Sequence, residues 1–375
     1  MSDAPMGESG GGTDDQPPRG PLAGVRVVEL AGIGPGPFAG MMLADLGADV
    51  TRIERPGPAD PFDVPVLRRG RTVVTADLKS DAGRAEVLAL VDDADLLVEP
   101  YRPGVMERLG LGPDVCLARN PRLVYGRMTG WGQDGPLSRY AGHDLTYTAL
   151  SGALSTFVRA DEAADDPSGA AAPPRPVLPG PYVGDLAGGA MMLVAGLLAA
   201  LHEATRTGRG QVVDAAIVDG AAYLTTFTHA LRVAGLWPHP PGHNVLDTGA
   251  PFYEVYRCAD DRHLAVGPLE PQFYAELLRL LDEGAGVRID TDDPRHPTRR
   301  LDPAGWPEGK RRWAVLFATR TRDEWCALLE RSDACVAPVL DLDEAAAHPH
   351  LLARAAYRDV DGMTLPAPAP RFRPG

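Results

Sequence analysis

Residues 25–54 read VRVVELAGIGPGPFAGMMLADLGADVTRIE, and this stretch decides the fold class. The apolar run at 25–30 is typical of a buried strand, and the glycines after it indicate a tight turn. Residues 38–46 have the pattern of a helix, and residues 49–54 have that of a second strand. A strand, a helix and a strand in this order predict a parallel pair with a crossover helix, which is the unit of an α/β sheet.

The same alternation continues along the chain. Strand-like runs at 72–76, 96–99 and 123–127 are separated by helical stretches, which predicts a parallel sheet covered by helices. Two long helices are expected later, one that starts near Asp185 and a second that runs from about residue 212 through residue 233. These elements place the larger part of the chain in the α/β class.

A second, smaller domain is predicted after the proline-rich run WPHPPG at 237–242, which has the composition of a domain boundary. Residues 252–257 and 263–267 alternate like antiparallel strands, and Pro271 is a favourable first residue of a helix. At 375 residues, the chain also exceeds the size at which one hydrophobic core stops growing. Two domains are therefore expected.

Two segments have a composition that buries little apolar surface. Residues 1–20 are rich in Gly, Pro, Asp and Ser, and residues 160–176 are rich in Ala, Asp and Pro, so we expect a disordered tail and a flexible insertion. The tail resembles neither a signal peptide nor a membrane span. The most apolar run, 186–201, is shorter than the roughly 20 residues that a spanning helix needs, which predicts a buried helix and no membrane partner.

Charge and cysteine content exclude further classes of protein. The net charge of -14 argues against a nucleic-acid partner. Only two lysines occur, Lys79 and Lys310, so Schiff-base chemistry has few possible sites. The four cysteines are scattered and form no C-x-x-C pair, which fits neither a disulfide framework nor a zinc site. We expect a reducing compartment, the cytoplasm.

The turn GPGPFA at 34–39 fits the dinucleotide-binding pattern G-x-G-x-x-A, and Glu54 follows at the end of a strand, as that pattern requires. However, Pro35 and Pro37 remove two of the backbone N–H donors that such a loop offers to a pyrophosphate. The alternative is a tight glycine turn that lets the helix pack close to its strand. We favour this structural interpretation, and we expect no dinucleotide cofactor.

Three residues are candidates for proton-transfer chemistry. His143, followed by Asp144, lies near an expected helix start, where an imidazole is either a base near neutral pH or part of a structural His–Asp pair. Asp185 precedes an apolar helix, where it is either a helix cap or a base beside free backbone N–H groups. Glu270 stands before Pro271, where Ser, Thr, Asp or Asn would be preferred.

The remaining histidines do not predict a metal site. His239 and His243 are four residues apart, but the prolines between them exclude the helix that a zinc-binding pair at this spacing needs. His348 and His350 flank Pro349 and are no better placed. No metal is expected.

Five further motifs are spaced along the chain: PLAGVRVVELAG at 21–32, LADLGADV at 43–50, GHD at 142–144, TGRGQ at 207–211 and APFY at 250–253. In these motifs the chain resembles the class III coenzyme A transferase superfamily and, within it, the α-methylacyl-CoA racemases. The resemblance covers residues 21–375.

The resemblance implies that His143 and Asp185 are two bases on opposite sides of the substrate's α-carbon, with Glu270 hydrogen-bonded to His143 and Asp144 in the same site. Proton transfer through an enolate needs only two groups of suitable pKa and a stabilised thioester oxygen, so no cofactor is expected besides the coenzyme A of the substrate. The implied coenzyme A contacts are Arg55, Ala76, Asp77, Leu78, Lys79, Pro100, Tyr101, Arg102, Arg108, Gly142 and Tyr147, where arginines would pair with phosphates.

The resemblance also implies a fold and an assembly. Each subunit is expected to have a large Rossmann-like domain and a smaller α+β domain, and two ring-like subunits are expected to interlock in an obligatory homodimer. Glu270 of one subunit would then approach His143 of the other. The implied bounds are a tail at 1–20, a large domain at 21–220, a linker at 221–244, a small domain at 245–341 and, at 342–375, a C-terminal segment that returns to the large domain.

Two other functions are compatible with parts of this pattern. A coenzyme A transferase of the same superfamily would use Asp185 as a nucleophile, but such enzymes usually carry an aromatic residue where His143 stands. A catalytically silent coenzyme A or acyl-CoA binding protein would keep the arginines and lose the bases. Because His143, Asp185 and Glu270 are all present, we predict a racemase that acts on 2-methylacyl-CoA thioesters.

Overall fold

The computed structural model describes residues 20–58, 62, 64–159 and 175–373. The expected tail and insertion therefore lie outside the described residues, apart from Gly20 and residues 175–176.

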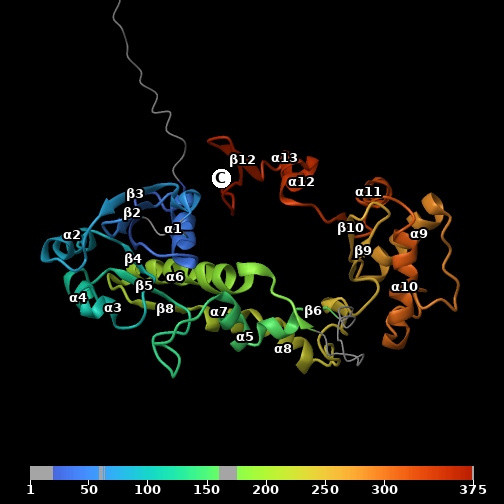
Figure 1. Cartoon of the computed structure of the whole chain (residues 1–375), viewed down its shortest axis with the longest axis horizontal. Helices are drawn as coiled ribbons and strands as arrows, with labels where there is room; N and C mark the ends of the chain where they lie inside the picture. The colour runs from blue at the N-terminus through green and yellow to red at the C-terminus, as the bar shows by residue number, and fades with distance from the viewer. Residues whose placement is uncertain (1–19, 59–61, 63, 160–174, 374–375) are drawn as a thin grey trace, which may run out of the picture. The chain divides into compact units, whose positions relative to one another are not determined.

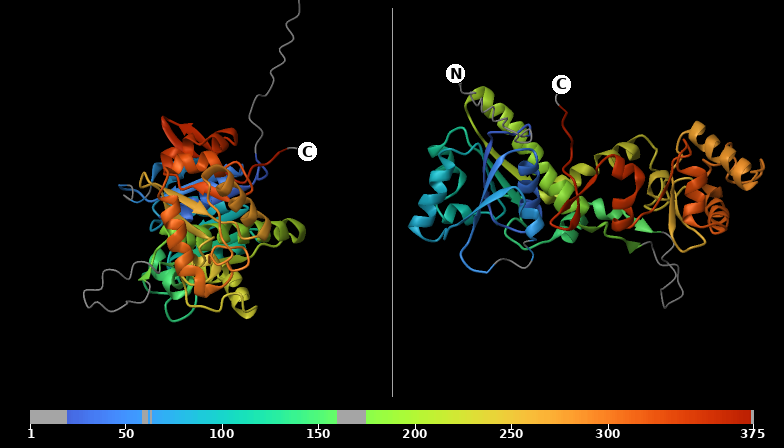
Figure 2. Two further views of the ribbon diagram at one scale, coloured as in Figure 1. Left: turned by 90° about the vertical axis from the view of Figure 1, so that its right-hand side faces the viewer. Right: turned by 90° about the horizontal axis from the view of Figure 1, so that it is seen from above.

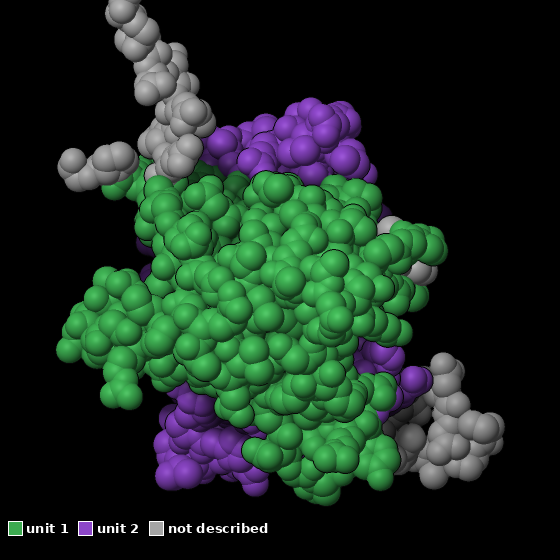
Figure 3. Space-filling model, turned by 90° about the vertical axis from the view of Figure 1, so that its left-hand side faces the viewer, with its two compact units in different colours: residues 1–140, 189–216, 368–375 green, residues 141–188, 217–367 purple. Residues whose placement is uncertain are grey.

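The chain divides into two compact units, which Figure 3 shows in different colours. The first unit consists of residues 1–140, 189–216 and 368–375. The second consists of residues 141–188 and 217–367. The domain bounds inferred from the sequence stay a prediction.

The first unit is built on a six-stranded parallel sheet (Figure 1). Its order is β3-β2-β1-β4-β5-β8, the strand order of a doubly wound Rossmann sheet. This confirms the predicted fold class. The strands are β1 (Arg26–Leu30), β2 (Asp49–Glu54), β3 (Arg71–Thr75), β4 (Leu96–Glu99), β5 (Val124–Thr129) and β8 (Val212–Ala216).

Helices cover both faces of this sheet because successive residues of a buried strand point to opposite sides. Tyr125 of β5 joins a core with side chains from α2 (Asp81–Val91), α3 (Val105–Arg108) and α4 (Pro113–Arg119). The next residue, Gly126, faces α6 (Met192–Thr207), and a Cβ here would lie 2.8 Å from Leu197. Helix α1 (Pro35–Asp45) packs against α6. A short 3-10 turn, η1 (Pro65–Arg68), precedes β3.

Close packing excludes a side chain at several glycines around the first turn. A Cβ on Gly32 would overlap the Pro100 ring, and a Cβ on Gly36 would lie 3.2 Å from the Pro100 Cβ. A Cβ on Gly40, one turn further along α1, would overlap the buried Glu29 carboxylate. Of these glycines, Gly36 belongs to the pattern at 34–39, and Gly34 of the same pattern has a positive φ of 66° that favours glycine. Both observations are consistent with the structural interpretation.

One element prediction was wrong. Residues 212–233 were expected to form one helix, but the first five form β8, and helices α7 (Ile217–Leu224) and α8 (Thr226–Val233) follow it. The reason is long-range pairing, because β8 completes the sheet beside β5. Valines at 212 and 213 also favour a strand.

The second unit begins with the segment that carries the candidate bases. It contains α5 (Asp144–Leu150), η2 (Ala153–Thr156), a two-stranded ribbon of β6 (Val158–Arg159) and β7 (Arg175–Pro176), and η4 (Gly180–Tyr182). The last two residues of the expected insertion thus form a strand. A π-helical stretch, Val183–Met191, follows and continues directly into α6. Asp185 therefore lies inside the helical run. The sequence had suggested that Asp185 precedes the helix.

The rest of the second unit contains the predicted antiparallel domain (orange in Figures 1 and 2). Its three-stranded sheet has the order β11-β10-β9. Buried aromatic side chains, among them Trp313, Phe317 and Trp325, form its core. The elements are η6 (Val245–Asp247), β9 (Glu254–Arg257), β10 (His263–Val266), α9 (Pro271–Ala285), η7 (Pro303–Gly305), α10 (Trp306–Phe317), α11 (Arg322–Leu329) and β11 (Val336–Pro338).

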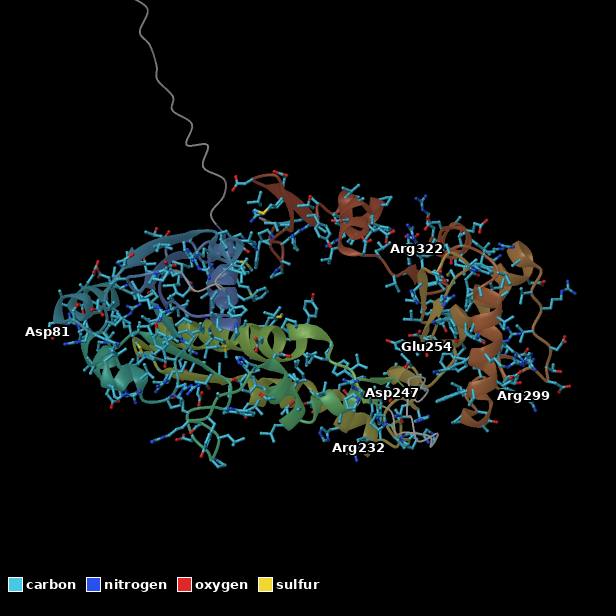
Figure 4. All side chains as sticks on the ribbon, viewed as in Figure 1. Asp81, Arg232, Asp247, Glu254, Arg299 and Arg322 are labelled. Carbon is cyan, nitrogen blue, oxygen red and sulfur yellow. The ribbon has the colours of Figure 1, made fainter. Side chains whose placement is uncertain are left out.

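A bidentate ion pair ties the C-terminal segment to α11. Arg322, labelled in Figure 4, donates from both Nη atoms to the Glu344 carboxylate at 2.8 Å. The guanidinium is 5% exposed, so water weakens this contact little. The segment contains α12 (Leu342–Ala347), α13 (Pro349–Ala353) and a hairpin of β12 (Tyr357–Val360) and β13 (Met363–Pro366).

The helical run Gly180–Thr207 is longer than the sequence suggested. By length and composition alone it would be able to cross a membrane, as core helices of soluble proteins also would. Its α6 portion packs against β5 and β8, as expected of a core helix.

Candidate active site

The backbone of Asp185 is held by the side chain of Asp144. The Asp185 N–H donates to Asp144 Oδ1 at 2.8 Å, which connects the π-helical stretch to the first turn of α5. The contact requires Gly184, because a Cβ at that position would overlap Asp144 Oδ1 and lie 2.9 Å from Thr148 Cγ2. Asp185 is half-buried.

The same helical stretch lies against α7. A Cβ on Gly188 would lie 2.7 Å from the Ala221 nitrogen, and a Cβ on Gly220 would overlap the Gly188 carbonyl oxygen. Two facing glycines therefore let the backbones approach closely. The helix that carries Asp185 is thus fixed by α5 through Asp144 and by α7 through this crossing.

His143 is the N-cap residue of α5, as the sequence predicted for the start of that helix. Its backbone N–H donates to Thr146 Oγ1 at 3.0 Å, and this hydroxyl donates to the His143 carbonyl oxygen at 2.8 Å. The His143 residue is exposed, so its ring is accessible to solvent or substrate. The structure thus brings His143, Asp144 and Asp185 together.

The pKa of Asp185 is raised to about 6. Burial is the largest cause, the charge of Asp144 adds to it, and the charge of His143 acts in the opposite direction. Asp144 Oδ2 is buried and has no hydrogen-bond partner among the described residues, so its charge is poorly screened. A carboxyl group with a pKa near 6 exchanges a proton readily close to neutral pH.

Glu270 is the N-cap of α9 and is exposed. The preceding residue is fixed by Arg300, whose Nη2 donates to the Leu269 carbonyl oxygen at 2.9 Å. Arg300 is 4% exposed and stacks over the rings of Phe252 and Tyr274 at 4.6 and 4.8 Å. Among the described residues, no hydrogen bond or ion pair joins Glu270 to His143.

In the first unit, the expected coenzyme A contacts follow the carboxyl ends of three strands of the sheet, β3 and β2 on one side of β1, and β4 on the other. Arg55 comes directly after β2, Lys79 shortly after β3, and Arg102 shortly after β4. Together with Arg108 at the end of α3, they are exposed cations. Ligands of doubly wound sheets bind at this edge. The neighbouring expected contacts there are Ala76, Asp77, Leu78, Pro100 and Tyr101.

The two remaining expected contacts flank the candidate bases. Gly142 precedes His143 and is half-buried, and Tyr147 lies one turn into α5 and is 8% exposed. Both therefore belong to the segment that carries the candidate bases.

Sequence reasoning missed a set of buried charges in the sheet. Glu29, Arg52 and Glu99 are fully buried, and Arg127 is 6% exposed. All four lie near the carboxyl ends of their strands. The available signal was a charged residue close to the end of an otherwise apolar strand, such as the glutamate in LLVE at 96–99.

Within the described part of the chain, no group of three His, Cys, Asp or Glu side chains is arranged to hold a metal ion. All four cysteines are free thiols.

Comparison with known proteins gives a consistent family. The model of CoA-transferase family III matches residues 22–374. Over 349 residues, covering 93% of this chain and 85% of the relative, the chain is 44% identical to the alpha-methylacyl-CoA racemase of Mus musculus. The Homo sapiens protein of the same name is 43% identical over 350 residues, with 93% and 86% covered. A solved CAIB/BAIF family protein from Brucella suis is 25% identical with a TM-score of 0.74, and 94% and 93% of the two chains are covered.

Proposed function

Because the chain belongs to CoA-transferase family III, we propose that it interconverts the (R) and (S) epimers of 2-methylacyl-CoA thioesters. The resemblance inferred from the motifs is confirmed by the family match and by relatives named as racemases. The structural observation that carries the proposal is the half-buried Asp185, whose pKa lies near neutrality, beside the exposed His143.

The reaction needs only one proton removed and one returned. The α-proton of a thioester is acidic because the resulting enolate places negative charge on the thioester oxygen. In one direction, the neutral His143 imidazole accepts this proton from one face, and protonated Asp185 donates its proton to the opposite face. In the other direction, the Asp185 carboxylate accepts the proton and the His143 imidazolium donates it. Each turnover exchanges the protonation states of the two groups.

The acid role of Asp185 depends on its surroundings. An ordinary aspartate, with a pKa of 3.8, would hold almost no proton at neutral pH. Burial and the Asp144 charge raise the pKa of Asp185 to about 6, so a useful fraction stays protonated. Glu270, contributed by the small domain of the partner subunit, would orient the His143 ring.

We propose that the cations at the carboxyl edge of the sheet hold the coenzyme A portion. Arg55, Lys79, Arg102 and Arg108 offer N–H donors to phosphate oxygens. Ala76, Asp77, Leu78, Pro100 and Tyr101 would contact the pantetheine or the nucleotide, and Gly142 and Tyr147 would line the thioester end.

We propose that the active protein is a homodimer with its active site at the subunit interface. Helix α8 buries none of its residues in the single chain, although it carries Phe227, 63% exposed, and Val233, 91% exposed. Tyr223 on α7 and Leu150 on α5 are likewise exposed, at 70% and 61%. Large apolar side chains gathered on neighbouring elements favour an interface with another chain.

The chemistry requires no cofactor, because two proton-transfer groups and donors to the thioester oxygen are sufficient. Four free cysteines are consistent with a reducing compartment, and we propose the cytoplasm.

The proposed reaction is tested by incubating the purified protein with one epimer of a 2-methylacyl-CoA in heavy water that contains EDTA. Mass spectrometry follows α-deuterium, and chiral separation follows the epimer ratio. We expect deuterium uptake together with drift toward both epimers. We expect both to fall by at least about 100-fold in His143→Ala and in Asp185→Asn, the usual scale of general acid–base catalysis.

Two outcomes would contradict the proposal. Transfer of coenzyme A to an added carboxylate, with release of the 2-methyl acid and without α-exchange, would identify a coenzyme A transferase that uses Asp185 as its nucleophile. Saturable binding with neither reaction would identify a binding protein.

A further inference from the structure

Glu99, Arg127 and Glu107 form a continuous chain of charged contacts in the first unit, here called the Glu99–Arg127–Glu107 chain. Arg127 Nε donates to Glu99 Oε1 at 2.9 Å, and Arg127 Nη1 donates to Glu107 Oε1 at 2.8 Å. Glu99 and Arg127 stand side by side in the register of β4 and β5. The Glu99–Arg127–Glu107 chain therefore reaches from the centre of the sheet to α3.

Its first end fixes the loop after β4. Glu99 Oε2 accepts the backbone N–H of Tyr101 at 2.8 Å. Pro100 is held at the same time by close packing over Gly32 and Gly36, and Tyr101 packs against the core of that face. The loop that leads to Arg102 is thus positioned by a buried carboxylate.

Its second end fixes α3. Glu107 accepts from Arg127, and Met106, one residue earlier, is fully buried in the core. The Arg108 N–H donates to the Gly104 carbonyl oxygen at 3.2 Å, so the orientation of α3 sets where the Arg108 side chain begins. The loop and the helix are therefore linked through one guanidinium.

Burying the Glu99–Arg127–Glu107 chain in the sheet costs desolvation free energy. Glu99 is fully buried, and burial raises its pKa to about 7 even though Arg127 and the Tyr101 N–H lower it. Buried ion pairs are often no more stabilising than apolar residues of the same volume, but they fix one geometry. The Glu99–Arg127–Glu107 chain contacts the two segments that carry the exposed cations Arg102 and Arg108. Its fixed geometry can therefore position these two cations.

We propose that Glu99 and Arg127 are positioning residues for the nucleotide portion of coenzyme A, because they hold Arg102 and Arg108 in the arrangement that binds its phosphates. The inference rests on the proposed function for the identity of the ligand. Neither residue touches the reacting carbon, so the effect falls on binding and leaves proton transfer unchanged.

The test uses the full chain with two substrates that carry the same 2-methylacyl group, one on coenzyme A and one on pantetheine, which lacks the nucleotide. We expect Glu99→Gln to raise KM for the coenzyme A thioester about tenfold with kcat within about twofold, the signature of lost uniform binding. The kcat/KM for the pantetheine thioester stays at the wild-type value.

Two further variants provide a second test and a matched control. Glu107→Gln removes the half-exposed end of the chain and leaves Glu99 and Arg127 in place, so it carries the test if Glu99→Gln does not fold. Asp92→Asn is the matched control, because Asp92 also pairs with an arginine, Arg119, but near the amino end of β4. It should leave both KM values unchanged.

Calorimetric titration with coenzyme A itself separates this inference from the proposed reaction. If wild type binds coenzyme A and Glu99→Gln weakens this binding about tenfold, the inference holds even without racemisation. If wild type racemises its substrate but neither Glu99→Gln nor Glu107→Gln changes KM or coenzyme A affinity, the inference is overturned. Equal losses with both thioesters would also overturn it.

Discussion

Asp144 shows how one side chain acts on a neighbour in two ways. Its Oδ1 orders the Asp185 backbone, and its charge helps to raise the Asp185 pKa. The charged groups that act on Asp185 from the described residues are Asp144 and His143. The pKa of the proposed base Asp185 is therefore set in part by a neighbouring carboxylate.

We expect Asp144→Asn to shift the pH profile of kcat/KM toward lower pH. Removing a negative charge lowers the pKa of Asp185, so the group loses its proton at lower pH than in wild type. The measurement is kcat/KM for epimerisation between pH 5 and 9. Thr148→Val is the control, because the Thr148 hydroxyl donates to the Asp144 carbonyl oxygen at 2.8 Å and its loss changes no charge. A reduced rate with an unshifted profile would leave Asp144 with a structural role only.

Gly184 provides the space for this contact, so we expect Gly184→Ala to destabilise the protein by about 1–3 kcal/mol, the usual effect of overpacking. The added methyl group would overlap Asp144 Oδ1. Combining it with Asp144→Ala removes the overlap with the Asp144 carboxylate and leaves only the close approach to Thr148 Cγ2, so the double variant should be more stable than the sum of the single effects. Urea unfolding measures all three variants. Additive effects would show that the two residues do not compete for the same space.

At the residue scale, the sequence indicated the candidate bases but not their coupling. His143 and Asp185 stood out because a histidine near a helix start and an aspartate beside an apolar helix suit proton transfer. The hydrogen bond from Asp185 to Asp144 spans 41 positions in the chain, so no local pattern encodes it. Only the folded arrangement of α5 and the π-helical stretch gives Asp185 its raised pKa.

Among the elements, β4 carries a carboxyl group with an unusually high pKa. The pKa of Glu99 is raised from 4.5 to about 7, chiefly by burial. The folded chain therefore keeps this proton at a pH where the unfolded chain has released it. The stability contributed by protonated Glu99 is fully present below about pH 4.5 and is lost as pH rises through about 7.

It follows that Glu99→Gln, which cannot ionise, should gain stability relative to wild type as pH rises from 5 to 8. The relative gain is at most about 3 kcal/mol, the equivalent of the shift in pKa. Urea unfolding at both pH values measures it. Glu107→Gln should show no such change between pH 5 and 8, because contacts with Arg127 outweigh burial and lower the Glu107 pKa, and that stabilisation is lost only as pH falls below about 4.5. A pH-independent difference for Glu99→Gln would mean that Glu99 titrates normally in the fold.

The elements themselves were predictable to different degrees. The bounds of β4 were predicted correctly because a short apolar run between turns has one reasonable interpretation. β8 was missed because its five residues continue without a break into the helical pattern of α7. Its identity as a strand depends on pairing with β5, which is information from another part of the sequence.

For the whole molecule, we expect a homodimer with twice the mass of one chain, and Val233→Asp should weaken it. A charge placed on the exposed face of α8 would be buried without a partner in an interface there. Analytical ultracentrifugation measures the mass, and circular dichroism checks the fold. Val115→Asp on α4, where the valine is 41% exposed, is the control expected to stay dimeric. A wild-type monomer that is fully active would contradict the proposed assembly.

The late recruitment of β8 has a consequence for biosynthesis. Residues 130–211 are made after β5 and before the strand that pairs with it. Until residue 216 has left the ribosome, the outer edge of β5 has unpaired N–H and C=O groups, which are a template for pairing with another chain. Parallel pairing across so long a connection also forms slowly. The nascent chain is therefore most prone to aggregation while the segment that carries the candidate bases His143 and Asp185 is being synthesised, and ribosome pausing or truncation between β5 and β8 should increase its demand for chaperones.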